Sequence, residues 1–422
     1  MNLYLIIILF ILIGEYFLDL AVEKLNLSSA KSYLPDEFAG FYDDDKYAKS
    51  QNYLKESTNF SLKEETFFTA LIVSFILYGG FNWVDKAARG LNFGLIPTAL
   101  VFAAILITGQ RISQIPFSIY RTFIIEERYG FNRTTPRTFI ADVFKSLFLT
   151  ILIGGIVFGA VVWFFNFKPK TAWLWSWIAV TLFELFVMFI APVFILPIFN
   201  KFVPLEEGDL KQAIEEYAKA ENFQMKGIFR MDASRRTSKS NAFFIGFGKN
   251  KRVVLFDTLI AKHSIDELVS VLAHEVGHYK KRHIMSMFVI SAITQGLMFF
   301  ILSFFINNQG LFDAFKMEKV SIYASLVFFG FLYAPINMIF SILTNVLSRG
   351  YEYQADSYAV KTYKKSEAFI LALKKLTVDN LSNLTPHPFK VFLQYSHPPV
   401  VKRIEALRRI KADKPRVIKN KL

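Results

Sequence analysis

Seven stretches of the chain are apolar over the length that a helix needs to cross a lipid bilayer, about 20 residues. They are residues 3–22, 66–84, 91–109, 146–167, 172–198, 284–306 and 320–345. The 422 residues are 53% hydrophobic and include 47 Phe, a composition far from that of an ordinary soluble protein. The sequence therefore predicts an all-α polytopic membrane protein with seven transmembrane helices.

The distribution of basic residues predicts how these spans are oriented. Seven spans place the segments 23–65, 110–145, 199–283 and 346–422 on one face of the membrane, and these segments carry nearly all of the Lys and Arg. Each short turn on the other face carries only two. Because cytoplasmic loops hold the excess of Lys and Arg, we expect the N-terminus outside and the C-terminus in the cytoplasm.

The net charge of +14 and the lack of cysteine narrow the range of functions. The basic residues lie mainly between and after the apolar spans, where topology and anionic lipid headgroups account for them, and no nucleic-acid-binding motif accompanies the charge. We therefore expect a lipid bilayer, and no nucleic acid, among the partners. Without cysteine, any metal site must use His and carboxylate ligands.

The stretch "ELVSVLAHEVGHYKKRHIMS" predicts a metal site on a helix. Ser264 and Glu267 have the spacing of a capping box, which opens a helix that runs through the HEVGH residues. On that helix His274 and His278 are one turn apart, so both imidazoles can face one ion, and Glu275 can reach a water on that ion. This arrangement suits hydrolysis.

A third ligand is expected in "SRGYEYQADSYAVKTY". Glu352 and Asp356 lie four residues apart on a helix that continues from the seventh span. Glu352 can bind the metal while Asp356 accepts a hydrogen bond from a ligating imidazole and sets its tautomer. The alternative is an ordinary amphipathic helix with solvated acids. His263, His283 and His387 have no such spacing, and we expect them at the surface or at interfaces.

Residues 241–247 and 252–256 are apolar or alternating and are joined by the turn sequence "GKNK", which predicts a β-hairpin just before the metal helix. An edge strand at this place can pair with an extended peptide through main-chain hydrogen bonds. The alternative is a strand within the core.

Several stretches together resemble the Ste24 family of integral membrane zinc metalloproteases, the CAAX prenyl proteases among the M48 peptidases. They are "DDDKYAKSQNYLKE", "FIIEERYGFN", "FNKFVPLEEGDLKQAIE", "SNAFFIGFGKNKRVVLFDTL", "HEVGH", "EYQAD" and "SHPPVVKRIEAL". The resemblance covers nearly the whole chain. It implies that the spans enclose a large water-filled chamber into which the active site opens.

The resemblance also implies roles for single residues. His274, His278 and Glu352 would hold one Zn²⁺ per chain, and Glu275 would be the general base that deprotonates the attacking water and passes the proton to the leaving amine.

In the same way, His397 would donate a hydrogen bond to the reacting carbonyl or to the substrate backbone. Arg403 would support the residues around the metal or the developing charge. Asn241, with Ala242 and Phe243, matches the position at which the family binds the substrate main chain.

These inferences predict an organisation and a function. Residues 1–198 would form spans one to five with their cytoplasmic loops, and 199–283 a cytoplasmic HExxH zinc-protease subdomain. Residues 284–345 would form spans six and seven, and 346–422 a cytoplasmic region with the third ligand.

The expected activity is a zinc endopeptidase that cuts a peptide or protein near the C-terminus. Its substrate would be of the CAAX (prenylated) type or another membrane-associated peptide or protein. The alternative is a metalloprotease for general membrane-protein quality control. A transporter or receptor is disfavoured, because the motif residues cluster in the cytoplasmic segments. The membrane would be the bacterial inner membrane or the endoplasmic reticulum.

Overall fold

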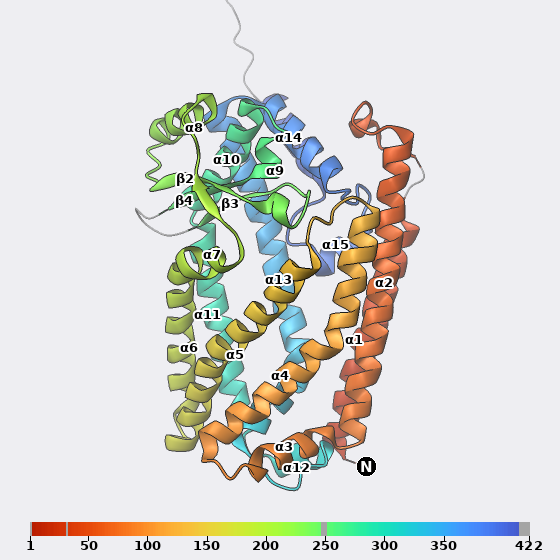
Figure 1. Cartoon of the computed structure of the whole chain (residues 1–422), viewed down its shortest axis with the longest axis vertical. Helices are drawn as coiled ribbons and strands as arrows, with labels where there is room; N and C mark the ends of the chain where they lie inside the picture. Colours follow the sequence, from red (N-terminus) through yellow and green to blue (C-terminus); the bar gives the residue numbers. More distant parts are fainter. Residues whose placement is uncertain (1, 31–32, 246–250, 413–422) are drawn as a thin grey trace, which may run out of the picture.

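The computed structural model describes all residues except 1, 31–32, 246–250 and 413–422. Long helices run along the long axis of the molecule, with a small sheet and several shorter helices at one end and the short helices α3 (Gly80–Gly90) and α12 (Gln309–Ala314) at the other (Figure 1). The N-terminus lies at the end opposite to the sheet.

Six helical segments among the described residues are long and apolar enough to cross a membrane. They are α1 (Leu3–Ser28), α4 with the π-helical turn that follows it (Leu95–Glu126), α5 (Pro136–Phe167), α6 continued to the end of α7 (Ala172–Phe199), α11 (His283–Leu302) and α13 (Ile322–Tyr363).

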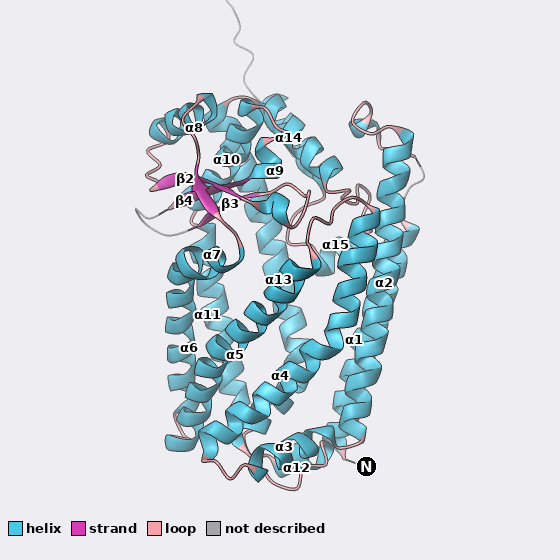
Figure 2. Cartoon of the chain, in the orientation of Figure 1, coloured by secondary structure: helices cyan, strands magenta, loops and turns pink. Residues whose placement is uncertain are grey.

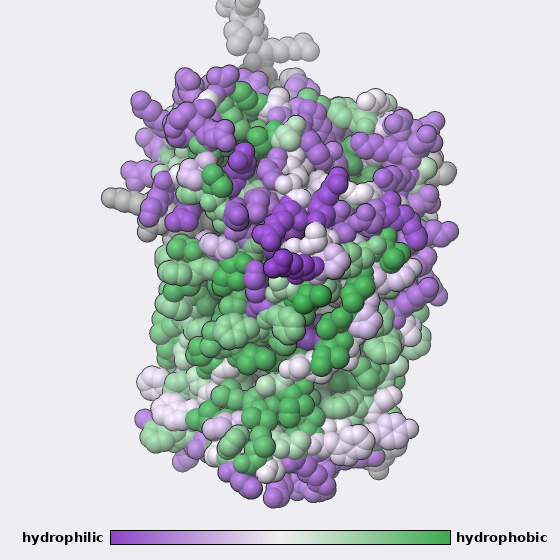
Figure 3. Space-filling model, viewed as in Figure 1, coloured by the Kyte–Doolittle hydropathy of each residue, from purple (hydrophilic) through white to green (hydrophobic). Residues whose placement is uncertain are grey.

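A seventh span is present only if a bent pair of helices counts as one. Helices α2 (Asp44–Leu77) and α3 meet at an angle of 66°. All seven predicted spans overlap these segments, but the number seven stays a prediction. Figure 3 shows apolar residues as a broad band across the face in view, with polar residues gathered at both ends.

Caps and prolines explain where the spanning helices begin and deform. Helix α5 starts with Thr135 as its N-cap, whose hydroxyl accepts the Thr138 N–H at 3.2 Å, and with Pro136 in its first turn, where the missing N–H costs nothing. Helix α6 (Ala172–Ile190) widens into a π-helical turn at Ala191–Ile195, which contains Pro192. A proline inside a helix removes one hydrogen bond, and the widened turn accommodates that loss.

The sheet has four strands in the order β1-β2-β4-β3 (Figure 2). The strands are β1 (Phe202–Pro204), β2 (Gly227–Met231), β3 (Ala242–Ile245) and β4 (Arg252–Phe256). Strands β3 and β4 are antiparallel, in the region of the predicted hairpin, while β2 and β4 are parallel. Most of the predicted turn lies outside the described residues. Strands β1 and β2 were not predicted from the sequence. The predicted hairpin strands β3 and β4 are therefore part of a larger mixed sheet, with β3 at its edge.

The end of the molecule that holds the sheet has a large hydrophobic core built from four distant segments. The shorter helices of the chain that have not yet been named are α8 (Asp209–Ala220), α9 (Asp257–Ile260), α10 (Ile265–Lys280), α14 (Ser366–Asp379), α15 (Pro388–Gln394) and α16 (Val400–Ala412). Phe38, Ile125, Leu272 and Phe369 are examples of core residues from segments 23–65, 110–145, 199–283 and 346–422. The four segments expected on one membrane face therefore pack together.

Candidate active site

The HEVGH residues lie in α10, which begins as the sequence predicts. The Ser264 hydroxyl accepts the Glu267 N–H at 3.4 Å, and a Glu267 carboxylate oxygen accepts the Ser264 N–H at 3.3 Å, which completes the capping box. Most of α10 is buried, including His274, which is 7% exposed. The capped start and the burial of this helix fix the direction of the His274 and His278 imidazoles.

A close crossing of α10 and α13 brings the two motifs together. Glu352 and Asp356 lie in the C-terminal part of α13, the continuous helix from the seventh predicted span, and are 3% and 0% exposed. At the crossing, a Cβ atom on Gly277 would lie only 3.0 Å from Ala355 Cα and 3.1 Å from its carbonyl oxygen. Only glycine allows the α13 backbone to approach this closely.

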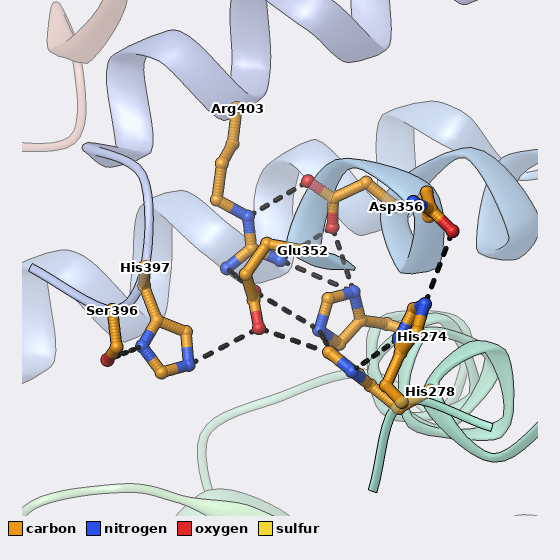
Figure 4. A network of polar contacts seen from close by, with 9 residues as sticks. His274, His278, Glu352, Asp356, Ser396, His397 and Arg403 are labelled. Carbon is orange, nitrogen blue, oxygen red and sulfur yellow. Dashed lines mark hydrogen bonds and ion pairs between the residues drawn. The ribbon is translucent and has the colours of Figure 1, made fainter. Parts of the chain in front are cut away.

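Three donor atoms converge between these helices (Figure 4). His274 Nε2 and His278 Nε2 are 3.1 Å apart, His278 Nε2 is 3.2 Å from Glu352 Oε1, and His274 Nε2 is 3.5 Å from Glu352 Oε2. Zinc–ligand bonds of about 2.0–2.1 Å at tetrahedral angles place ligand atoms about 3.3 Å apart. The observed spacings therefore fit one tetrahedral ion, and the donor set is one that zinc prefers.

Asp356 and Arg403 support this group from behind. The Asp356 Oδ1 atom is 2.8 Å from His274 Nδ1, on the side of the imidazole away from the converging donors. Arg403, from α16, donates to both carboxylate oxygens of Asp356 at 2.9 and 2.6 Å, and its Nη1 lies 3.2 Å from Glu352 Oε2. The guanidinium thus compensates two buried carboxylates, whose burial unpaired would be costly.

His397 and Glu275 also lie at the converging donors. His397 Nε2 is 3.3 Å from Glu352 Oε1, its Nδ1 is 2.9 Å from Ser396 Oγ, and its side chain is 66% exposed (Figure 4). Glu275 and His397 line one cavity together with the converging donors, and burial raises the pKa of Glu275 above the ordinary value for a carboxylic acid. A carboxylate with a raised pKa is a stronger base when it is ionised.

Two histidines expected at the surface or at interfaces are buried in the structure. His263 is 8% exposed, and its Nδ1 lies 3.0 Å from Glu267 Oε2. His283 is 4% exposed and lies beside His278, with 3.1 Å between their Nδ1 atoms. The expectation of a surface position was wrong for both residues. For His283, the spacing of five residues from His278 conceals the fact that the chain turns between α10 and α11.

A cavity of about 630 Å³ joins these groups to the edge strand β3, and Asn241, Ala242, Phe243 and Phe244 line it. The Asn241 carbonyl accepts the Phe256 N–H at 3.1 Å. Since inward and outward groups alternate along an antiparallel strand, the backbone groups of Ala242 and Phe244 point away from β4. The Ala242 N–H is taken by the Asn241 side chain at 2.9 Å. The sequence analysis did not single out Phe244.

Comparisons with known proteins show the family of the chain. Residues 24–201 match the model of the CAAX prenyl protease N-terminal region, described as five membrane helices, and residues 204–411 match peptidase family M48. The chain belongs to the M48 peptidase family. It is therefore an integral membrane metallopeptidase, whose spanning helices were described above.

Relatives of this M48 peptidase resemble it over most of its length. It is 36% identical over 406 residues to the CAAX prenyl protease 1 homolog of Arabidopsis thaliana, and the matched residues cover 94% of each chain. It is 34% identical over 414 residues to the CAAX prenyl protease 1 of Saccharomyces cerevisiae, with 91% and 90% covered. The crystal structure of S. mikatae Ste24p superposes with a TM-score of 0.91 at 31% identity, over 96% of this chain and 99% of that one.

Proposed function

We propose that this M48 peptidase is a zinc endopeptidase that cuts CAAX-type, prenylated substrates near their C-terminus at the membrane. The observation that carries the proposal is that side-chain donor atoms of His274, His278 and Glu352 lie 3.1 to 3.5 Å from one another, at the wall of a cavity that Glu275 and the edge strand β3 also line. The substrate class rests on relatives that are called CAAX prenyl proteases.

In this proposal His274, His278 and Glu352 hold the zinc ion. Zinc at this place would supply a Lewis acid that polarises the scissile carbonyl. It would also lower the pKa of the attacking water, so that the water loses its proton more readily. Glu275 takes the proton of the attacking water and returns it to the leaving amine, a task that suits a carboxylate whose pKa is raised by burial.

The other residues orient and stabilise. Asp356 accepts the His274 Nδ1–H and leaves the Nε2 lone pair for the metal, and Arg403 holds Asp356 in place. Arg403 thus supports the residues around the metal, one of the two roles that the resemblance left open. His397, exposed at the cavity, donates a hydrogen bond to the oxygen on which negative charge develops.

The substrate backbone extends the sheet at β3. The outward carbonyl of Ala242 and the outward N–H and carbonyl of Phe244 offer main-chain hydrogen bonds, and Asn241 adds a side-chain amide. Pairing of this kind reads the backbone, so it tolerates varied side chains, and Phe243 contributes as part of the cavity wall.

Purified enzyme offered two substrates side by side tests the proposal. We expect about one zinc per chain, cleavage of a farnesylated CAAX peptide near its C-terminus, and slower cleavage of an unmodified membrane protein. Activity that survives complete metal removal would refute the zinc mechanism. Preferred cleavage of the unmodified protein would replace the substrate class with membrane-protein quality control.

We also propose that the peptidase end of the molecule faces the cytoplasm, with the N-terminus outside, because the Lys and Arg concentrate on that side. A topology reporter inserted at Ala87 should report the outside, and one fused after Leu422 the cytoplasm. The opposite result would place the active site on the other side of the membrane.

A further inference from the structure

The two imidazoles that face the proposed metal are supported on their far side by different groups. His274 Nδ1 faces a carboxylate oxygen of Asp356 at 2.8 Å. His278 Nδ1 instead lies 3.1 Å from Nδ1 of His283, the first residue of α11. Arg282, with a left-handed φ of 58°, ends the helical path of α10 and turns His283 back toward His278.

The hydrogen positions follow from the donor atom that His278 offers to the metal. Its Nε2 lies 3.2 Å from Glu352 Oε1, among the converging donors, so a metal there takes the Nε2 lone pair and the proton resides on Nδ1. The His278 Nδ1–H then needs an acceptor, and His283 Nδ1 accepts only if His283 carries its own proton on Nε2. That Nε2 lies 3.3 Å from Gln354 Oε1, which accepts it.

We propose that His283 is a positioning residue for the second zinc ligand: its neutral Nε2–H tautomer, held by Gln354, keeps His278 in the tautomer that presents Nε2 to the metal. The inference rests on the proposed zinc site. Gln354 lies two residues after Glu352 on α13, so this chain of hydrogen bonds connects one ligand-bearing helix to the other. His283 accepts the Nδ1–H of His278, as Asp356 accepts the Nδ1–H of His274, but it is a neutral acceptor and not a carboxylate.

Packing fixes the ring of His283 as well as its hydrogen bonds. It stacks on Tyr351, with ring centres 4.2 Å apart and an angle of 7° between the rings, and only 4% of the residue is exposed. The stacking and the hydrogen bond can be separated by substitution. Phe keeps a flat ring against Tyr351 but cannot accept the hydrogen bond from His278, whereas Asn places an amide oxygen near the position of Nδ1.

The test is zinc affinity, measured on the purified full chain by competition with a chelator. We expect His283→Phe to bind zinc about 10- to 100-fold more weakly than wild type, as for other groups that orient ligating histidines. His283→Asn should recover most of this loss. As a matched control, His263→Phe replaces another buried histidine of the same region that contacts no proposed ligand, and it should bind zinc as wild type does.

The outcomes separate this inference from the proposed function. Wild-type protein that binds no zinc would refute the zinc site itself. Wild-type binding with an unchanged affinity in His283→Phe would overturn the role of His283 alone. If His283→Phe does not fold, His283→Ala and His283→Asn make the same comparison, because only Asn can accept the hydrogen bond from His278. Equal affinities of these two variants would overturn the inference.

Discussion

Two pairs of helices close around acidic side chains, and they treat those acids differently. Between α10 and α13, Glu352 and Asp356 are met by histidines of α10 and of the loop before α16, and by an arginine of α16. Between α6 and α11, in the predicted spans, Glu184 accepts hydrogen bonds from Ser291 at 3.3 Å and from Gln295 at 2.6 Å, both neutral donors. The acids of the first pair are surrounded by imidazoles and a guanidinium, whereas the acid of the second pair links two helices through hydrogen bonds from neutral side chains.

The difference follows from the surroundings of each pair. A carboxylate surrounded by cations and imidazoles is kept ionised and available as a ligand. A carboxyl group met by an amide and a hydroxyl forms the kind of interhelical hydrogen bond that strengthens helix packing in a bilayer. Loss of a charge or of close packing should therefore weaken zinc binding at the first pair and leave it unchanged at the second.

The largest effect is expected from Glu352→Ala, which removes a proposed ligand. Two imidazoles without the carboxylate bind zinc much more weakly, so zinc and activity should be lost together. Metal analysis beside an activity assay decides it. Should the variant retain both, the third ligand lies elsewhere, and Asp356 is the first alternative to examine.

Glu275→Gln should separate chemistry from metal binding in the same helix pair. The amide cannot take the proton of the attacking water, so turnover should fall about 10²-fold or more, while His274, His278 and Glu352 keep the zinc. The measurement is kcat together with zinc content. Loss of zinc from this variant would show that Glu275 is a ligand and not the base.

Neutralising one acid in each pair tests the comparison directly. Asp356→Asn removes one of the two charge partners of Arg403 and weakens the acceptor of His274 Nδ1–H, so zinc affinity should fall about 10- to 100-fold. Glu184→Gln keeps an acceptor for its neighbours, so we expect unchanged zinc affinity and a change in stability within about 1 kcal/mol. Comparable zinc loss in both variants would contradict the distinction between the two pairs.

The glycines at the two crossings allow a milder test. Gly277→Ala places a methyl group against the α13 backbone, which cannot yield, and should destabilise the protein by about 1–3 kcal/mol and weaken zinc binding. At Gly296, on α11, the nearest atoms belong to the Trp177 side chain at 3.1 Å, which can shift. Gly296→Ala should therefore leave zinc affinity unchanged. Thermal unfolding and chelator competition measure the two effects.

The smallest effect is expected at His263, which is buried just before the N-cap of α10. Burial lowers the pKa of His263, despite Glu267 nearby. Below pH about 6.5 the unfolded chain therefore binds a proton that the folded chain resists, so this contribution to stability is lost as the pH falls toward the folded pKa. The melting temperature should drop more steeply from pH 7 to 5 in wild type than in His263→Gln. Parallel curves would contradict the assignment.

The sequence alone predicted the features that depend on neighbouring residues. The apolar length of each span, the capping box at Ser264 and Glu267, and the four-residue spacing of His274 and His278 are local patterns, and a helix turns them directly into geometry. Glu352 was also found in this way, because it lies on the helix that continues from the last span.

Only the tertiary structure decided which groups meet across long stretches of chain. It brought Arg403 to Asp356 and placed Ala242 and Phe244 at the open edge of a four-stranded sheet. It also turned His283 back onto His278. These contacts depend on the packing of segments that are far apart in sequence, and on one left-handed residue between two helices. No local pattern of residue types encodes such pairings, because they arise from the shape of the whole core.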